Sequence, residues 1–319
     1  VIAAGITAST IGRLYLSYGV LSGLGIGIGY NATLSLMNEW FPDKKGTSLG
    51  ILMMSFGASA LVCGNIAAGL MSSPLGWRAV YRLLGILTGS ALLAEALLLR
   101  HPAAEDRIPE LRPSSEPEKG ILKQEPMKEY TPKKMLCQPV WLRFFLFLML
   151  ANAVGNSTIS MARDVAVSVG AQTGLAALLA GILSLCNGVG RLFSGMLFDR
   201  FGQRFTMLLD GIITMAAPAV MLAAVLLHSV PVCAAGLCLS GFSYSFQPPV
   251  TTSVVSSFFG SKYFSINYSI TNLVLIPASL SATISGVLYT SAGSFLAPFT
   301  LLLILSAFSF ALNLTIRHT

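Results

Sequence analysis

The stretch "NGVGRLFSGMLFDRFGQR", residues Asn187–Arg204, places one cation inside an apolar run and follows it with a short charged turn. Arg191 comes after residues 165–190, which contain no Asp, Glu, Lys or Arg. Asp199, Arg200 and Arg204 then surround Gly202, a residue type that permits a sharp change of chain direction. Because an arginine within hydrocarbon is costly, the pattern predicts a membrane helix with a functional cation, a charged turn and a second helix.

The remainder of the chain has the composition of an integral membrane protein. Of 319 residues, 54% are hydrophobic and 10% are charged, whereas a soluble domain carries about 25% charged residues. A membrane-spanning helix needs roughly 20 apolar residues. Windows without Asp, Glu, Lys or Arg cover residues 14–38, 46–77, 144–162, 165–190, 211–261 and 263–316. We therefore predict an all-α integral membrane fold.

These windows and the polar breaks between them predict ten helical segments. We place them at residues 1–12, 14–37, 46–71, 78–100, 141–162, 173–198, 205–227, 230–252, 265–289 and 293–316. Residues 101–138 hold seven basic and seven acidic residues and six prolines, a composition typical of a flexible, solvated linker. The predicted organisation is a partial N-terminal helical half over 1–100, a linker over 101–138 and a six-helix C-terminal half over 139–319.

The distribution of basic residues predicts the orientation of the helices. Loops must alternate between the two sides of the membrane, and one set of loops holds 15 of the 20 basic residues. That set contains Lys44, Lys45, Arg100, the linker, Arg143, Arg200, Arg204, Lys262 and Arg317. Since Lys and Arg accumulate on the cytoplasmic side, we expect the linker and the C-terminus to face the cytoplasm of a multi-pass cell-membrane protein. The same topology explains the net charge of +7 without a nucleic-acid partner.

A weak internal repeat relates the two halves. "GIGYNATLSLMNEWF" (Gly27–Phe41) resembles "GFSYSFQPPVTTSVVSSFF" (Gly241–Phe259), with Tyr30 matching Tyr244. Both copies lead into loops placed on the same side, so the repeat is parallel, as in one class of transporters. A complete 6+6 repeat would place a copy of Gly190–Arg204 before Val1, and we expect two helices and most of a third to precede that residue.

The charged turn also carries a family resemblance. "GRLFSGMLFDRFGQR" resembles the signature loop of the major facilitator superfamily, with Gly195, Asp199, Arg200, Gly202 and Arg204 at the motif positions. "GLGIGIGYN", "NEWFPDKKGTSLGI", "GWRAVY" and "NGVGRLFSG" are similar to the branch that contains oxalate/formate antiporters and monocarboxylate transporters. The resemblance implies a two-half helical bundle that rocks between two states. It implies that the charged turn between the segments predicted at 173–198 and 205–227 helps to gate this motion. The same charges would also suit a role in setting the topology and capping the helices.

In the family's twelve-helix bundle, an arginine of the eighth helix binds the substrate carboxylate. The resemblance implies that Arg191, in the segment predicted at 173–198, occupies that place. The antiporter has a lysine in its eleventh helix where this chain has Leu275, so a small monocarboxylate fits better than a doubly charged anion. Arg191 could instead extend to the cytoplasmic edge or pair with a residue of the helices expected before Val1. Asn187, one helical turn earlier, shares its face. Further residues predicted to line the cavity are Tyr30, Asn31, Tyr244, Gln247, Thr271 and Asn272.

We therefore predict a secondary transporter for a small organic anion such as formate, lactate or pyruvate. The coupled partner is either a proton or an exchanged anion. Glu95 and Asp210 lie near predicted cytoplasmic helix ends, where we expect them to be interfacial or paired with signature-loop arginines rather than to carry protons. An exporter of drugs or neutral metabolites is the alternative. The five cysteines lack zinc or disulfide spacing, and no catalytic cluster of His, Asp or Glu is evident, so neither a cofactor nor an enzymatic activity is expected.

Overall fold

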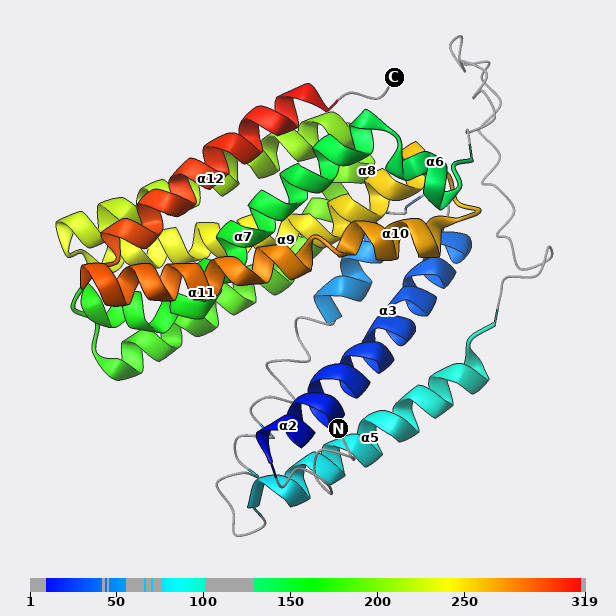
Figure 1. Ribbon diagram of the computed structural model, residues 1–319, viewed down its shortest axis with the longest axis horizontal. Helices are drawn as coiled ribbons and strands as arrows, with labels where there is room; N and C mark the ends of the chain where they lie inside the picture. The colour runs from blue at the N-terminus through cyan, green and yellow to red at the C-terminus, as the bar shows by residue number, and fades with distance from the viewer. Residues whose placement is uncertain are drawn as a thin grey trace. The chain divides into compact units, whose positions relative to one another are not determined.

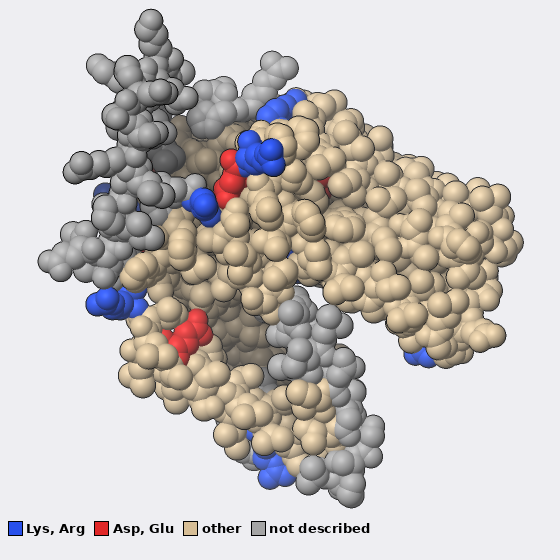
Figure 2. All heavy atoms as spheres, turned by 180° about the vertical axis from the view of Figure 1, so that it is seen from behind, with Lys and Arg blue, Asp and Glu red and all other residues tan. Residues whose placement is uncertain are grey.

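The computed structural model describes residues 10–41, 44, 46–55, 66, 70, 76–100 and 129–316. Every described element is a helix, which confirms the predicted all-α fold. Six described helices are long and apolar enough to cross a membrane. They are Ile11–Trp40, Gly76–Leu98, Pro139–Ser168, Thr173–Leu227, Phe264–Ala292 and Leu296–Thr315. Figure 2 shows the corresponding surface, on which Lys, Arg, Asp and Glu occupy only small areas of the displayed face.

The chain forms two compact units, Val1–Asp43 with Ala58–Gln124 and Lys44–Gly57 with Glu125–Thr319. These ranges differ from the predicted division at two places. The helix Gly46–Ser55 belongs to the second unit, because it packs on the helix that carries Arg191. Residues 129–138, predicted as part of a flexible linker, also belong to the second unit. The predicted segments 1–9, 56–65 and 101–128, and the C-terminal Arg317, lie outside the described residues.

The first unit contains two long helices that run in the same direction (Figure 1). One is continuous through α2 (Ile11–Leu14), the π-helical turn η1 (Tyr15–Val20) and α3 (Leu21–Trp40). The other is α5 (Gly76–Leu98). Tyr18 contacts Tyr81 ring to ring at 5.5 Å, and the Thr33 hydroxyl donates to the Glu95 carboxylate at 3.0 Å. Because contacts advance along both helices together, the two helices are parallel.

The second unit is a bundle of longer helices. A short helix, α6 (Pro132–Leu136), precedes α7 (Pro139–Ser168), α8 (Thr173–Leu227) and α9 (Val230–Phe259). The chain continues through α10 (Phe264–Asn272), α11 (Leu275–Ala292) and α12 (Leu296–Thr315). In Figure 1, α11 and α12 lie against α7, while α8 packs on α9 and α12.

The two helices predicted at 173–198 and 205–227 are present as the two parts of α8, which are separated by non-helical backbone at Gly202. Three other predicted helices need correction. The helix predicted at 265–289 is divided into α10 and α11 at residues 273–274. The helices predicted to end at residues 162 and 252 continue to Ser168 and Phe259. Charge-free windows mark the part of a helix inside hydrocarbon, whereas the hydrogen-bonded helix extends beyond it into polar surroundings.

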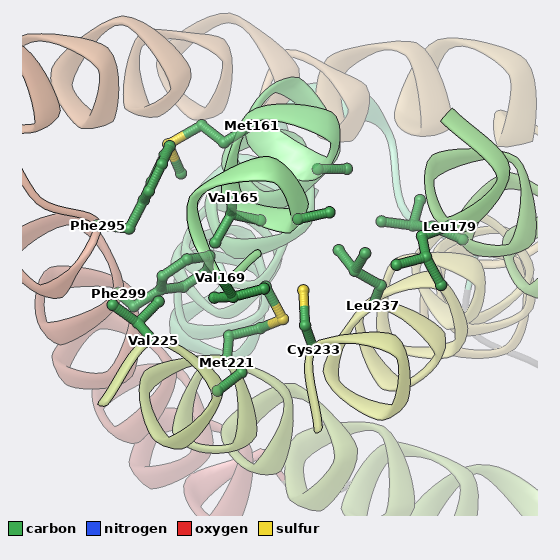
Figure 3. Close-up of a cluster of buried hydrophobic side chains, with 14 of the residues drawn as sticks. Met161, Val165, Val169, Leu179, Met221, Val225, Cys233, Leu237, Phe295 and Phe299 are labelled. Atoms are coloured by element: carbon green, nitrogen blue, oxygen red, sulfur yellow. The ribbon is translucent and has the colours of Figure 1, made fainter. Parts of the chain in front are cut away.

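An apolar cluster holds one end of the second unit together (Figure 3). Met161 and Val165 of α7 meet Leu179 and Met221 of α8 in this cluster. Side chains of α9 and α12 complete it: Cys233, Leu237, Phe295, Phe299 and Leu302. Because lipid is as apolar as these side chains, close packing rather than the exclusion of water stabilises the contact. The cluster fixes α8 and α9 beside each other, and these two helices carry most of the candidate site.

Candidate substrate site and charged turn

Arg191 lies in the interior of the second unit, as the sequence predicted for a cation within a membrane helix. Its side chain is 7% exposed. The guanidinium donates a hydrogen bond from Nη1 to the backbone carbonyl of Met53, at 3.1 Å, on the helix Gly46–Ser55. A guanidinium has five N–H donors in a planar fork that matches a carboxylate. The residue therefore both joins two helices and has the chemistry of an anion-binding group.

Asn187 lies one turn before Arg191, at the crossing of α8 and α9. Within the described part of the chain, the buried side-chain oxygen of Asn187 has no hydrogen-bond donor. The two helices approach closely here, because a Cβ atom added to Gly190 or Gly241 would overlap the facing helix. Small residues at such a crossing allow close helix packing in membranes.

Tyr244 and Gln247 of α9 lie in different environments. Tyr244 is half-buried, and its ring packs directly on Gly155 of α7, where a Cβ atom would overlap it. Gln247 is buried, and its Nε2 donates to both carboxylate oxygens of Asp210, at 3.1 and 2.9 Å. Gln247 is thus part of a polar contact between α8 and α9 that the sequence did not predict.

The remaining predicted cavity residues lie on other helices. Thr271 is buried at the end of α10, where its hydroxyl accepts a hydrogen bond from the Trp141 indole at 3.1 Å and donates to the Asn267 carbonyl at 2.8 Å. Asn272 is half-buried beside the break between α10 and α11, and Leu275 is 43% exposed. Tyr30 and Asn31 are half-buried on α3, in the first unit. Of the predicted residues, Arg191 and Asn187 lie on α8 and Tyr244 and Gln247 lie on α9, and these two helices pack on each other.

In the charged turn, Asp199 caps the start of the helix Gly46–Ser55. Its carboxylate accepts hydrogen bonds from the backbone N–H of Gly46 at 2.9 Å and of Thr47 at 2.7 Å, and from the Thr47 hydroxyl at 2.6 Å. The first N–H groups of a helix have no partner within the helix, and the positive end of the helix dipole favours an anion. The signature aspartate thus connects α8 to a helix about 150 positions away in sequence.

Gly195 allows Asp199 to reach this helix end. A Cβ atom on Gly195 would overlap the Gly46 carbonyl, and a Cβ atom on Gly46 would overlap Gly195 in turn. A Cβ atom on Gly50 would likewise crowd the backbone of Arg191 and Leu192. The backbones of α8 and of the helix Gly46–Ser55 are therefore in direct contact, which places the signature turn and Arg191 along one helix crossing.

The rest of the charged turn stabilises a second helix end. Gly202 has φ +75°, a conformation that favours glycine, and it divides α8. Arg204 then donates to the backbone carbonyls of Asn313 at 3.1 Å, Ile316 at 3.0 Å and Leu314 at 3.3 Å. A cation at a helix C-terminus is stabilising. Arg204 therefore caps the C-terminus of α12, whereas Asp199 caps the N-terminus of the helix Gly46–Ser55. Arg200 is exposed, with its guanidinium 5.4 Å from the Phe201 ring.

Sequence reasoning missed the position of Asp210. We expected it near the cytoplasmic end of a helix, at the interface or paired with signature-loop arginines, but it is 0% exposed and contacts Gln247 and Thr214. Arg204, the nearest signature arginine, is engaged at the end of α12. The sequence contained a signal for this burial. Asp210 lies two helical turns beyond Gly202 and directly before the charge-free window 211–261, so it is already inside the helix that follows the turn.

The buried Arg191 and the charged turn that follows it lie within the part of the chain that matches a known family. The model of the Major Facilitator Superfamily matches residues 1–275. The chain belongs to this superfamily. It is a family of membrane transporters rather than enzymes, so the chain is a multi-pass membrane protein and the predicted superfamily is confirmed.

Curated relatives within the superfamily include bacterial and animal proteins. The chain is 29% identical to the uncharacterized MFS-type transporter YhjX of Escherichia coli (strain K12), over 81% of this chain and 60% of that protein. It is 27% identical to mouse monocarboxylate transporter 12, over 92% of this chain and 64% of the relative. It is 26% identical to the oxalate:formate antiporter of Oxalobacter formigenes, over 62% of this chain and 44% of the antiporter. The chain thus spans less than two thirds of the length of these relatives.

Proposed function

We propose that this chain is part of a secondary transporter that moves a small organic anion by alternating access. The substrate class is a monocarboxylate, such as formate, lactate or pyruvate. The observation that carries the proposal is the buried guanidinium of Arg191 on α8, 7% exposed and within one helical turn of Asn187. The names of the relatives, monocarboxylate transporter 12 and oxalate:formate antiporter, support a carboxylate substrate.

The chemistry of Arg191 favours a singly charged anion. A carboxylate can accept two parallel hydrogen bonds from one guanidinium, which fixes the orientation of the substrate as well as binding it. Leu275 stands where the resemblance would place a second cation for a dicarboxylate, and Asn187 offers a neutral polar group one helical turn from Arg191. Tyr30 and Asn31 of α3 remain predicted substrate-binding residues, in accordance with the repeat that relates Tyr30 to Tyr244.

We further propose that the Asp199 cap acts as a latch during transport. The carboxylate holds the start of the helix Gly46–Ser55 in one state, and the contact breaks when the two halves rock. In this proposal the charged turn, the linker and the C-terminus face the cytoplasm, in accordance with the excess of Lys and Arg in those loops.

Binding of labelled formate, lactate or pyruvate to the purified full-length gene product tests the role of Arg191. We expect Arg191→Ala to weaken binding about 10- to 100-fold, since hydrogen bonds to a charged group contribute about 1.5–3 kcal/mol. Arg163→Ala is the matched control, because it removes an exposed arginine at the end of α7. If Arg191→Ala lowered the melting temperature but left the affinity unchanged, the residue would be a structural link to Met53 and the proposed substrate role would be wrong.

An exporter of drugs or neutral metabolites is the second candidate function. A thermal-shift screen of anions, cations and neutral compounds separates the two hypotheses. Stabilisation by small carboxylates alone supports the first, and stabilisation by large neutral or cationic compounds, unaffected by Arg191→Ala, supports the second.

A further inference from the structure

Asp210 is a fully buried carboxyl group that the proposed anion site does not use. It lies on α8, two turns after the break at Gly202, and its side chain is 0% exposed. Gly211, the next residue, packs so closely on Phe310 and Asn313 of α12 that a Cβ atom would overlap them. Asn313 also donates a hydrogen bond to the Met207 carbonyl, one turn before Asp210. Helix packing therefore closes off the carboxyl group.

The helices packed on this part of α8 offer few charges to Asp210. α9 (Val230–Phe259) and α12 (Leu296–Thr315) contain no Asp, Glu, Lys, Arg or His. On α7, Arg143 lies in the first turns, while Arg163 and Asp164 are exposed near its other end. On α8 itself, Arg204 donates to the carbonyls that end α12, and Arg191 donates to Met53. Among the described residues, the hydrogen-bond partners of Asp210 are Gln247 and Thr214, and both are uncharged.

The partners of Asp210 suit two protonation states. The ionised carboxylate accepts from Gln247 Nε2 at both oxygens and from the Thr214 hydroxyl at 3.2 Å. The other amide atom, Gln247 Oε1, is buried and has no hydrogen-bond donor among the described residues. A protonated carboxyl group has an O–H that can donate to such an oxygen while its carbonyl accepts from Nε2. A small rotation of the amide then gives a paired acid–amide arrangement in which both Gln247 atoms are satisfied.

A hydroxyl pair extends from the carboxyl group along the contact of α8 and α9. The Thr214 and Ser243 hydroxyls lie 2.7 Å apart, and either oxygen can be the donor. Both side chains are buried. Hydroxyls that can reverse their donor and acceptor roles are the groups that relay a proton between a buried carboxyl and its surroundings. The pair therefore extends the polar contact of Asp210 from α8 to α9.

We propose that Asp210, held by Gln247, is the proton-binding site of this transporter, and that the anion is carried together with a proton rather than exchanged for a second anion. The inference rests on the proposed transport function and adds the coupling ion to it. The hydrogen-bonding groups of Gln247 accommodate both forms of the carboxyl group, and the carboxylic acid is the proton-bound form.

The step conserves atoms and charge. A proton from water on one side adds to the Asp210 carboxylate and forms a carboxylic acid, which donates to Gln247 Oε1. After the conformational change, the O–H bond breaks and the proton passes to water on the other side, which restores the carboxylate. No bond to the transported anion forms or breaks.

A direct measurement of protonation tests the site without any transport. Infrared difference spectra of the purified full-length protein, recorded as pH is lowered, should show the C=O stretch of a buried, neutral carboxylic acid. We expect that band to disappear in Asp210→Asn, to shift in Asp210→Glu and to persist in Asp164→Asn, which removes an exposed carboxyl group of α7. Asp210→Glu keeps the test decisive if Asp210→Asn fails to fold. A titrating band that is the same in all folded variants would overturn the assignment.

Uptake into liposomes then tests the coupling. In the native protein, an inward proton gradient should drive net uptake of labelled formate. Asp210→Asn should lower net uptake at least tenfold yet retain exchange of internal for external formate, and Asp210→Glu should restore part of the net uptake. Proton-driven uptake equal to that of the native protein in Asp210→Asn, or net uptake that depends on sodium rather than on the proton gradient, would overturn the proposal. Absence of any formate flux in the native protein would instead count against the proposed substrate class, and the infrared result would stand independently.

Discussion

Replacing Asp199 with alanine removes three hydrogen bonds from the start of the helix Gly46–Ser55. The acceptors are the two carboxylate oxygens, and the donors are the Gly46 and Thr47 N–H groups and the Thr47 hydroxyl. Within the first turn of a helix these N–H groups have no carbonyl partner of their own. The substitution therefore exposes two backbone donors and removes the charge that faces the helix dipole.

The magnitude follows from these two contributions. Loss of a capping side chain costs about 1 kcal/mol, and loss of an anion at a helix N-terminus costs about 0.3–1 kcal/mol. The sum, about 1–2 kcal/mol, corresponds to about a 5- to 30-fold change in the equilibrium between the capped and the open helix end. Asp199→Asn keeps an oxygen acceptor but loses the charge, so we expect a smaller change of about 2- to 5-fold.

Hydrogen–deuterium exchange of the Gly46 and Thr47 amides measures this equilibrium directly. The native protein should protect both amides, Asp199→Ala should accelerate their exchange by the factor above, and Asp199→Asn should fall between the two. Asp164→Ala, which removes an exposed carboxyl group elsewhere, provides the control. Exchange in Asp199→Ala within twofold of the native rate would refute the capping argument, and with it the proposed latch.

Two further predictions concern packing and the end of the linker. Gly195→Ala forces a Cβ atom onto the Gly46 carbonyl and should destabilise the protein by about 1–3 kcal/mol. Gly181→Ala, on the same helix but with open space around it, should not destabilise the protein. Thermal unfolding of both variants measures the difference. Glu129→Ala removes the acceptor for the Lys262 N–H and should loosen residues 129–138, so that trypsin cleaves faster at the exposed Lys133; equal cleavage rates in the native and variant proteins would contradict this contact.

The ordered segment at residues 129–138 illustrates what local composition could not predict. Its charges and prolines indicate a solvated linker, yet Tyr130 donates to the Phe259 carbonyl at 3.0 Å and its own carbonyl accepts from Asn267 at 3.0 Å. These partners follow more than a hundred positions later in the chain. The composition of a segment describes its affinity for water, whereas its order depends on whether distant backbone groups are available to it.

The candidate site was predicted in part. Arg191 was identified because a charge in a long apolar window is conspicuous, and the structure places it in the interior. Asp210 was expected at the interface or paired with signature-loop arginines, but it is buried and its partners are Gln247 and Thr214. Gln247 was predicted as a cavity residue, but its observed partner is the Asp210 carboxylate. Gln247 and Asp210 come together only because of the register in which α9 packs against α8.

The sequence by itself determined the membrane class, the position of most helices, the break at Gly202 and the superfamily. Within hydrocarbon each backbone N–H and C=O must be satisfied inside its own segment, so a long apolar window leaves the helix as the available structure. Tertiary structure alone decided that Asp199 caps the helix Gly46–Ser55, that Arg204 caps α12 and that Asp210 meets Gln247. Each of these contacts joins groups far apart in the chain, and their geometry exists only after the helices have packed.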